Sequence, residues 1–214
     1  MQRASLLFGA SFLLNAAFGY LFHLLLGRVL TVADFGLVVF LESVLGICGL
    51  ALVNGYPPLT TRLLSHAGDD RRSAILRRTL TYNLLLAALF AGALVGLWWL
   101  GVLDVGGAGL LLVALLCATL LLTAAGAILK ATLQGEFRFE RASAVLVAEQ
   151  AVKLGAGIAL AVAGLTVVGA MVSLALAAAV GVVLALVLLP SRMYRRGGRA
   201  PDGIAAMGLP MFLG

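Results

Sequence analysis

Six long apolar runs fill this 214-residue chain and determine the solvent in which it folds. Each run is close to the ~20 helical residues that cross a hydrocarbon core of ~30 Å. Because lipid offers the backbone no hydrogen-bonding partner, unalternating runs of this length cross only as helices. The sequence therefore predicts an all-α polytopic membrane protein. The expected spans are Ser5–Leu26, Leu37–Val53, Leu80–Leu100, Leu110–Leu129, Ala142–Ala163 and Val167–Leu189.

The positions of the basic residues predict how these spans are oriented. Lysine and arginine outnumber the acids by 15 to 9, but they are spread over the connections between spans, which argues against nucleic-acid binding. With the N-terminus in the cytoplasm, all of them except Arg28 and Lys153 fall on the cytoplasmic side. Basic loop residues are retained on that side. We therefore expect a multi-pass protein of the inner (cytoplasmic) membrane with a cytoplasmic N-terminus.

The sequence contains no recognisable motif of a catalytic site. Cys48 and Cys117 lie in separate spans, where they are typical small apolar residues. No zinc, haem, P-loop or nucleophile-elbow motif occurs. We therefore expect no enzyme activity, no catalytic residue, no metal and no other cofactor.

The connections divide the chain into a lobe, a linker and a final apolar segment. Residues 1–189 hold the six spans, and residues 190–202 form a basic cytoplasmic linker. Residues 203–214 are apolar again but too short to cross the bilayer. They are either an interfacial tail or the start of a seventh transmembrane helix in a truncated chain, and we adopt the second interpretation.

The connection after the second span, Asn54–Thr79, is the longest and most charged. Pro57 and Pro58 end the second span, because proline lacks a donor and clashes with a continuing helix. Gly68 is a plausible helix stop, and Asp69 or Asp70 is a plausible cap for the helix that follows. We expect that helix to extend the third span beyond the membrane.

Several short motifs resemble those of a known transporter family. Gly27-Arg28-Val-Leu30, then Phe35-Gly36, then Ser43, Gly55 and Thr61-Arg62 are similar to the N-terminal signature of oligosaccharide (polysaccharide) flippases. Those proteins belong to the multidrug/oligosaccharidyl-lipid/polysaccharide exporter superfamily. Gln134-Gly-Glu-Phe-Arg-Phe139 and the Gly208-Leu-Pro210 segment also resemble that family. The resemblance implies a transporter of 12–14 helices in two lobes, of which this chain is the first six-helix lobe plus the start of a seventh helix.

Ionisable residues within the spans are the candidate functional groups, because they are costly at membrane depth. Glu149, Gln150 and Lys153 lie together in the fifth span, with Lys153 near the midplane. The i, i+4 spacing of Glu149 and Lys153 favours an ion pair within the helix. Two interpretations stay open: Lys153 is a cavity cation that binds a substrate diphosphate, or it only neutralises Glu149.

Three further polar residues occupy the first two spans, and Arg28 lies in the outer connection between them. His23 and Glu42 are at similar depth on an antiparallel hairpin, so we expect them to be able to hydrogen-bond across it. The pair is either a proton-responsive coupling site or a contact that locks the hairpin. Asn15 either lines the cavity or bridges helices. Arg28 either contacts a lipid headgroup or closes its loop, or it acts as a gate or contacts the sugar of the substrate.

Three functions are compatible with this pattern. The resemblance favours flipping of a lipid-linked oligosaccharide for polysaccharide biosynthesis by alternating access, with a lipid-diphosphate-linked glycan as substrate. A cation-coupled multidrug exporter of the same superfamily is the second, although no acid occurs between Arg3 and Arg28. A non-transport membrane scaffold is the third. The partners expected for the first function are the bilayer and either a missing C-terminal lobe or a second copy of the chain.

Overall fold

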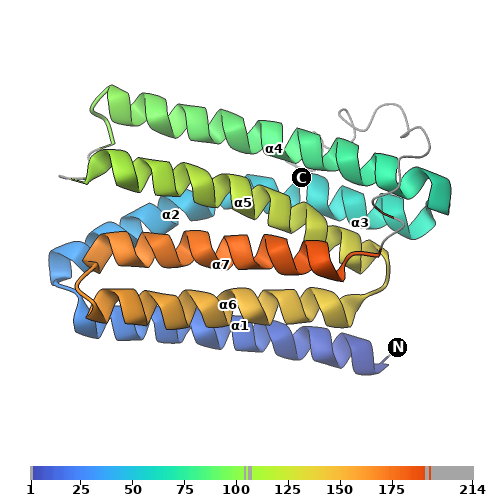
Figure 1. Ribbon diagram of the computed structural model, residues 1–214, viewed down its shortest axis with the longest axis horizontal. Helices are drawn as coiled ribbons and strands as arrows, with labels where there is room; N and C mark the ends of the chain where they lie inside the picture. The colour runs from blue at the N-terminus through green and yellow to red at the C-terminus, as the bar shows by residue number, and fades with distance from the viewer. Residues whose placement is uncertain (1, 104, 106–107, 191–192, 194–214) are drawn as a thin grey trace.

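A computed structural model describes residues 2–103, 105, 108–190 and 193 (Figure 1). Of these residues 89% are helical, and no strand occurs among them. The expected linker and seventh helix lie outside the described residues, apart from Pro190 and Met193. The helices are α1 (Gln2–Val29), α2 (Val32–Asn54), α3 (Tyr56–His66), α4 (Asp69–Trp99), α5 (Gly109–Gly135), α6 (Phe139–Val162) and α7 (Thr166–Leu188).

The membrane-spanning character expected from the sequence is confirmed. Six helical stretches are long and apolar enough to cross a bilayer, with α2 and α3 counted as one stretch. Large apolar side chains on their outer faces are exposed, as lipid-facing positions require; Leu13, Ile47 and Leu89 are examples. The chain is therefore an all-α, multi-pass membrane protein.

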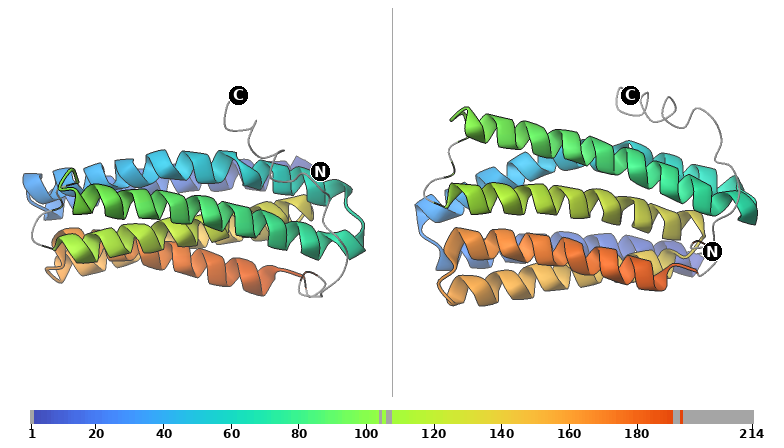
Figure 2. Two further views of the ribbon diagram at one scale, coloured as in Figure 1. Left: turned by 90° about the horizontal axis from the view of Figure 1, so that it is seen from above. Right: turned by 45° about the horizontal axis from the view of Figure 1, so that its top comes forward.

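The helices lie side by side along the long axis of the molecule (Figures 1 and 2). Helix α1 packs along α6, α6 along α7, α7 along α5, and α5 along α4. Helix α2 packs against α5 and touches α1 very little. We call the end that carries α3 and the α5–α6 turn the α3 end, and the end that carries the α1–α2 turn the far end.

Two helices extend beyond the apolar runs; the expected helical extension of the third span is confirmed in α4, whereas that of α5 was not expected. Helix α4 begins at Asp69, with Gly68 at its N-cap and no side-chain cap, so Asp69 and Asp70 complement the helix dipole from the first turn. Helix α5 continues to Gly135. The expectation that Lys130 lies in a connection is therefore wrong, because the helix continues for more than a turn beyond the apolar run.

The break between α2 and α3 orients α3 for docking onto α5. Gly55 ends α2, and the prolines that follow are tolerated in the first turn of α3, where backbone donors have no intrahelical partner. The Thr61 hydroxyl donates to the Ala131 carbonyl oxygen at 3.1 Å. A Cβ at Gly135 would lie 3.0 Å from the Thr61 carbonyl oxygen, so the two backbones meet closely because this residue is glycine.

Candidate functional site

A cavity of about 700 Å³ opens between α2 and α3 on one side and α5 and α6 on the other. Its walls combine apolar residues such as Leu146 with a group of polar side chains from three helices. No carboxylate occurs among the lining residues that the structure describes. The polar residues of the wall include Asn54, Thr61, Arg62, Thr123, Lys130 and Gln134.

Lys130 is the cation that α5 presents to this cavity. Its Nζ donates to both carboxylate oxygens of Glu149 on α6, at 2.6 and 2.9 Å. The side chain of Lys130 is 24% exposed and that of Glu149 is 12% exposed. Lys130 therefore lines the cavity while its ammonium group is paired with Glu149, which is not a lining residue.

Glycines on two neighbouring helices make room for the Glu149 carboxylate. A Cβ at Gly181 of α7 would collide with the carboxylate, and a Cβ at Gly126 of α5 would lie 3.8 Å from its Oε1. Small residues let helices approach closely in a membrane bundle. Here they also form a slot that holds Glu149 against Lys130.

A second ionic cluster joins α1, α2 and α6 nearer the far end. Glu42 Oε2 lies 2.6 Å from His23 Nε2, and Glu42 Oε1 lies 2.8 Å from Lys153 Nζ. The Lys153 ammonium group also lies 4.3 Å from the centroid of the Phe22 ring. Because Glu42 contacts both His23 and Lys153, it connects the α1–α2 hairpin to α6.

The structure confirms one of the two side-chain pairs predicted from the sequence and contradicts the other. The contact between His23 and Glu42 is confirmed. The expected ion pair between Glu149 and Lys153 is wrong, since Glu149 binds Lys130 and Lys153 binds Glu42. Tertiary neighbours on α5 and α2 provide closer partners than the next turn of the same helix.

The remaining candidates do not join either cluster. Gln150 is half-buried on α6, and Arg28 is exposed in the last turn of α1. Asp34 accepts a hydrogen bond from the Thr31 hydroxyl at 2.8 Å, in the N-terminal turn of α2. The Asn15 Oδ1 atom is shielded from solvent and accepts no hydrogen bond within the described part of the chain.

Sequence reasoning missed the cavity residues Lys130 and Arg62 as functional candidates. Both were assigned to topology-setting connections because they follow apolar runs. The signal that could have identified Lys130 is helical continuation: the segment from Lys130 to Gln134 contains no helix breaker. No His, Cys, Asp and Glu cluster within the described ranges is arranged to hold a metal ion.

Comparison with known proteins gives one family match. The sequence profile described as polysaccharide biosynthesis protein matches residues 3–207, which is nearly the whole chain. No curated protein and no solved structure matches the chain. The family gives the chain a role in polysaccharide synthesis or export. This membrane-embedded six-span bundle thus belongs to the polysaccharide biosynthesis protein family.

Proposed function

We propose that the chain forms one lobe of a transporter that flips a lipid-linked oligosaccharide across the inner membrane by alternating access. In this proposal the N-terminus lies in the cytoplasm, so the α3 end is the cytoplasmic end. The second lobe is supplied by further helices or by a second copy of the chain. The six apolar stretches and the family membership support a membrane role in polysaccharide synthesis or export.

The single observation that carries the proposal is a cation on the wall of a cavity. Lys130 lines the 700 Å³ cavity, and its counter-ion Glu149 is buried and is not a lining residue. A diphosphate that enters a low-dielectric site needs a positive charge, whose effect is far larger there than in water. We assign the diphosphate contact to Lys130 on α5, with Arg62 on α3 as a second cation on the opposite wall of the cavity.

The candidates predicted from the sequence take supporting roles in this proposal. Lys153 is stabilised by Glu42 in the resting state, and release of that contact makes its charge available to the substrate. Glu149 orients Lys130, whereas Gln150, Asn15 and Arg28 stay candidate substrate contacts. The glycan and diphosphate cross beside these residues while the lipid tail stays in the bilayer.

Coupling is assigned to Glu42 and His23. Glu42 binds both His23 and Lys153, so a proton taken up by this carboxylate weakens both contacts at once. The link that Glu42 makes from α2 to α1 and α6 is then weaker. In this way a proton gradient biases one orientation of the lobe over the other.

The test is translocation by the full-length protein in vesicles. A lipid-linked oligosaccharide with a fluorescent sugar is incorporated, and an impermeant reductant reports how fast the sugar crosses. The double variant Lys130→Gln/Glu149→Gln removes the cation and its counter-ion together, so no buried charge is left unpaired. We expect its rate to fall by roughly 10-fold or more, the effect of losing one charged hydrogen bond.

Two controls make this result specific. Lys130→Arg keeps the charge and should retain most of the rate. Arg77→Gln removes an exposed charge from α4 that does not line the cavity, and it should leave the rate unchanged. Wild-type translocation by Lys130→Gln/Glu149→Gln would remove Lys130 from the mechanism. Drug-driven proton release by the wild-type protein would favour the multidrug exporter instead.

A further inference from the structure

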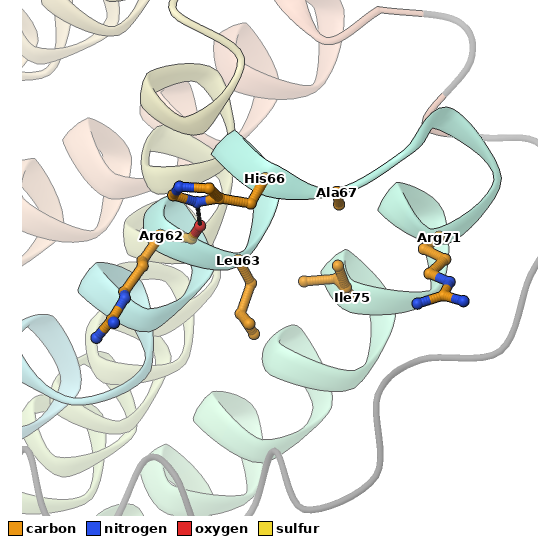
Figure 3. Close-up of a pocket in the computed structure, with 6 residues that line it drawn as sticks. All are labelled: Arg62, Leu63, His66, Ala67, Arg71 and Ile75. Atoms are coloured by element: carbon orange, nitrogen blue, oxygen red, sulfur yellow. Dashed lines mark hydrogen bonds between the residues drawn. The ribbon is translucent and has the colours of Figure 1, made fainter.

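A second hollow, of about 370 Å³, lies between α3 and the first turns of α4 (Figure 3). Figure 3 shows the guanidinium groups of Arg62 and Arg71 on opposite sides of the hollow, with Leu63 and Ile75 between them. The hollow therefore has a cationic rim and an apolar floor. This combination suits an amphiphile that carries a negative charge.

The two rim arginines have no counter-ion within the described part of the chain. Both are exposed, and no carboxylate occurs among the described lining residues. The adjacent Arg72 differs, because it binds the Glu136 carboxylate and the Ala67 carbonyl oxygen. The charges of Arg62 and Arg71 are thus available to an external anion, whereas that of Arg72 is used within the fold.

The rim is also held in place by the turn that forms it. The Nδ1 atom of His66 lies 3.0 Å from the Arg62 carbonyl oxygen and 2.9 Å from the Ser65 hydroxyl (Figure 3). These contacts fix the imidazole ring over the last turn of α3. Arg72 Nε donates to the Ala67 carbonyl oxygen at 3.0 Å, which ties the end of α3 to α4.

The depth of the hollow matches the headgroup layer of a bilayer. The apolar run of α4 begins at Leu80, and Ile75 precedes it by roughly 7 Å along the helix. The headgroup layer on each side of the hydrocarbon core is about 5–8 Å thick. The floor of the hollow is therefore at headgroup level, whereas Arg71 begins about 13 Å from Leu80 along the helix, so its side chain reaches the phosphate by extending back toward the bilayer.

We propose that this hollow binds the phosphate headgroup of an anionic membrane lipid. Arg62 and Arg71 contact the phosphate, because guanidinium groups form paired hydrogen bonds with phosphate oxygens. Leu63 and Ile75 contact the glycerol part of the headgroup. The site shares Arg62 with the cavity of Lys130, but its other lining residues differ, and the proposal does not depend on whether the chain flips a glycan.

The test measures lipid retained by the full-length protein after release from nanodiscs. The nanodiscs contain phosphatidylcholine alone or with phosphatidylglycerol, and native mass spectrometry counts the bound lipids. We expect wild type and Arg77→Gln to retain phosphatidylglycerol, and Arg62→Gln/Arg71→Gln to retain roughly 30-fold less. Equal retention by Arg62→Gln/Arg71→Gln and Arg77→Gln would overturn the proposal.

Two further arms guard against a folding defect and against a different anion source. Leu63→Glu leaves both arginines in place but brings a carboxylate into the hollow, so it should also release phosphatidylglycerol, and unchanged retention would count against the site. Inorganic phosphate is added to the wild-type protein as a competitor. Displacement of the lipid by millimolar phosphate would assign the hollow to a soluble anion and overturn the lipid assignment, whereas undiminished retention would support it.

Discussion

Glu149 and Lys153 stand one helical turn apart on α6, and each binds a residue on a different helix. Glu149 accepts from Lys130 on α5, and Lys153 binds Glu42 on α2. The two ion pairs thus connect α6 to α5 and to α2, two of the helices that line the cavity. Breaking either ion pair leaves a charge inside the bundle without its partner. The resulting loss of stability measures how strongly the two side chains of that pair interact.

Reversal of the Lys130–Glu149 pair should restore what single changes remove. Lys130→Glu or Glu149→Lys places two like charges together, and each should destabilise the protein by about 3–5 kcal/mol. The double variant Lys130→Glu/Glu149→Lys recreates an ion pair and should recover most of the loss. Thermal unfolding of the detergent-solubilised protein measures the coupling. Additive losses in the double variant would mean that the two side chains do not interact.

The shared carboxylate of Glu42 should matter more for stability than its histidine partner. Glu42→Gln leaves Lys153 without its ion-pair partner, whereas His23→Gln leaves the Glu42–Lys153 contact intact. We expect the first substitution to lower the melting temperature by several degrees more than the second, from a difference of about 1–3 kcal/mol. Equal losses would show that Lys153 does not depend on Glu42.

The glycine slot around Glu149 gives a matched pair of alanine substitutions. Gly181→Ala places a methyl group where the Glu149 carboxylate lies, so the acid must move away from Lys130. Gly126→Ala meets Val182 at 3.6 Å, an ordinary contact, and should be tolerated. We expect a loss of about 1–3 kcal/mol for Gly181→Ala, seen in thermal unfolding. A similar small effect for both would show that the slot is not tight.

Neighbouring arginines on α4 should differ sharply in their contribution to the fold. Arg72 bonds to the Glu136 carboxylate, whose side chain is fully buried, and to the Ala67 carbonyl oxygen. Arg72→Gln should therefore destabilise the protein by about 1–3 kcal/mol. Arg71→Gln removes an exposed charge and should change stability by less than about 0.5 kcal/mol. Protease sensitivity of the α3–α4 turn gives an independent measure.

Phe137 in the α5–α6 turn has a left-handed backbone, with φ of 57°. Its N–H donates to the Gln134 carbonyl oxygen, and the Arg138 N–H donates to that of Leu133, a helix-ending pattern that usually contains glycine. Phe137→Gly should relieve strain of roughly 1 kcal/mol. Phe137→Ala keeps the Cβ and should give no such gain. Calorimetry in a uniform detergent distinguishes them.

The sequence predicts the helices well because the length of an apolar run can be read directly from consecutive residues. It also predicts the contact of His23 with Glu42, because the depth of each residue in the membrane can be counted from the turn that joins two consecutive helices. It does not predict the partners of Glu149 and Lys153, which depend on how α5 and α2 pack against α6. Lys130 was misplaced because the end of an apolar run does not mark the end of a helix.

The docking of α3 onto α5 has a consequence for how the cavity changes its access. The hydrogen bond from Thr61 to Ala131 and the close approach at Gly135 join the two backbones directly. Helix α3, which carries Arg62 on the cavity wall, therefore cannot move independently of the remaining helices. A substrate would enter or leave the cavity only when the whole bundle tilts as a rigid body relative to the lobe opposite it.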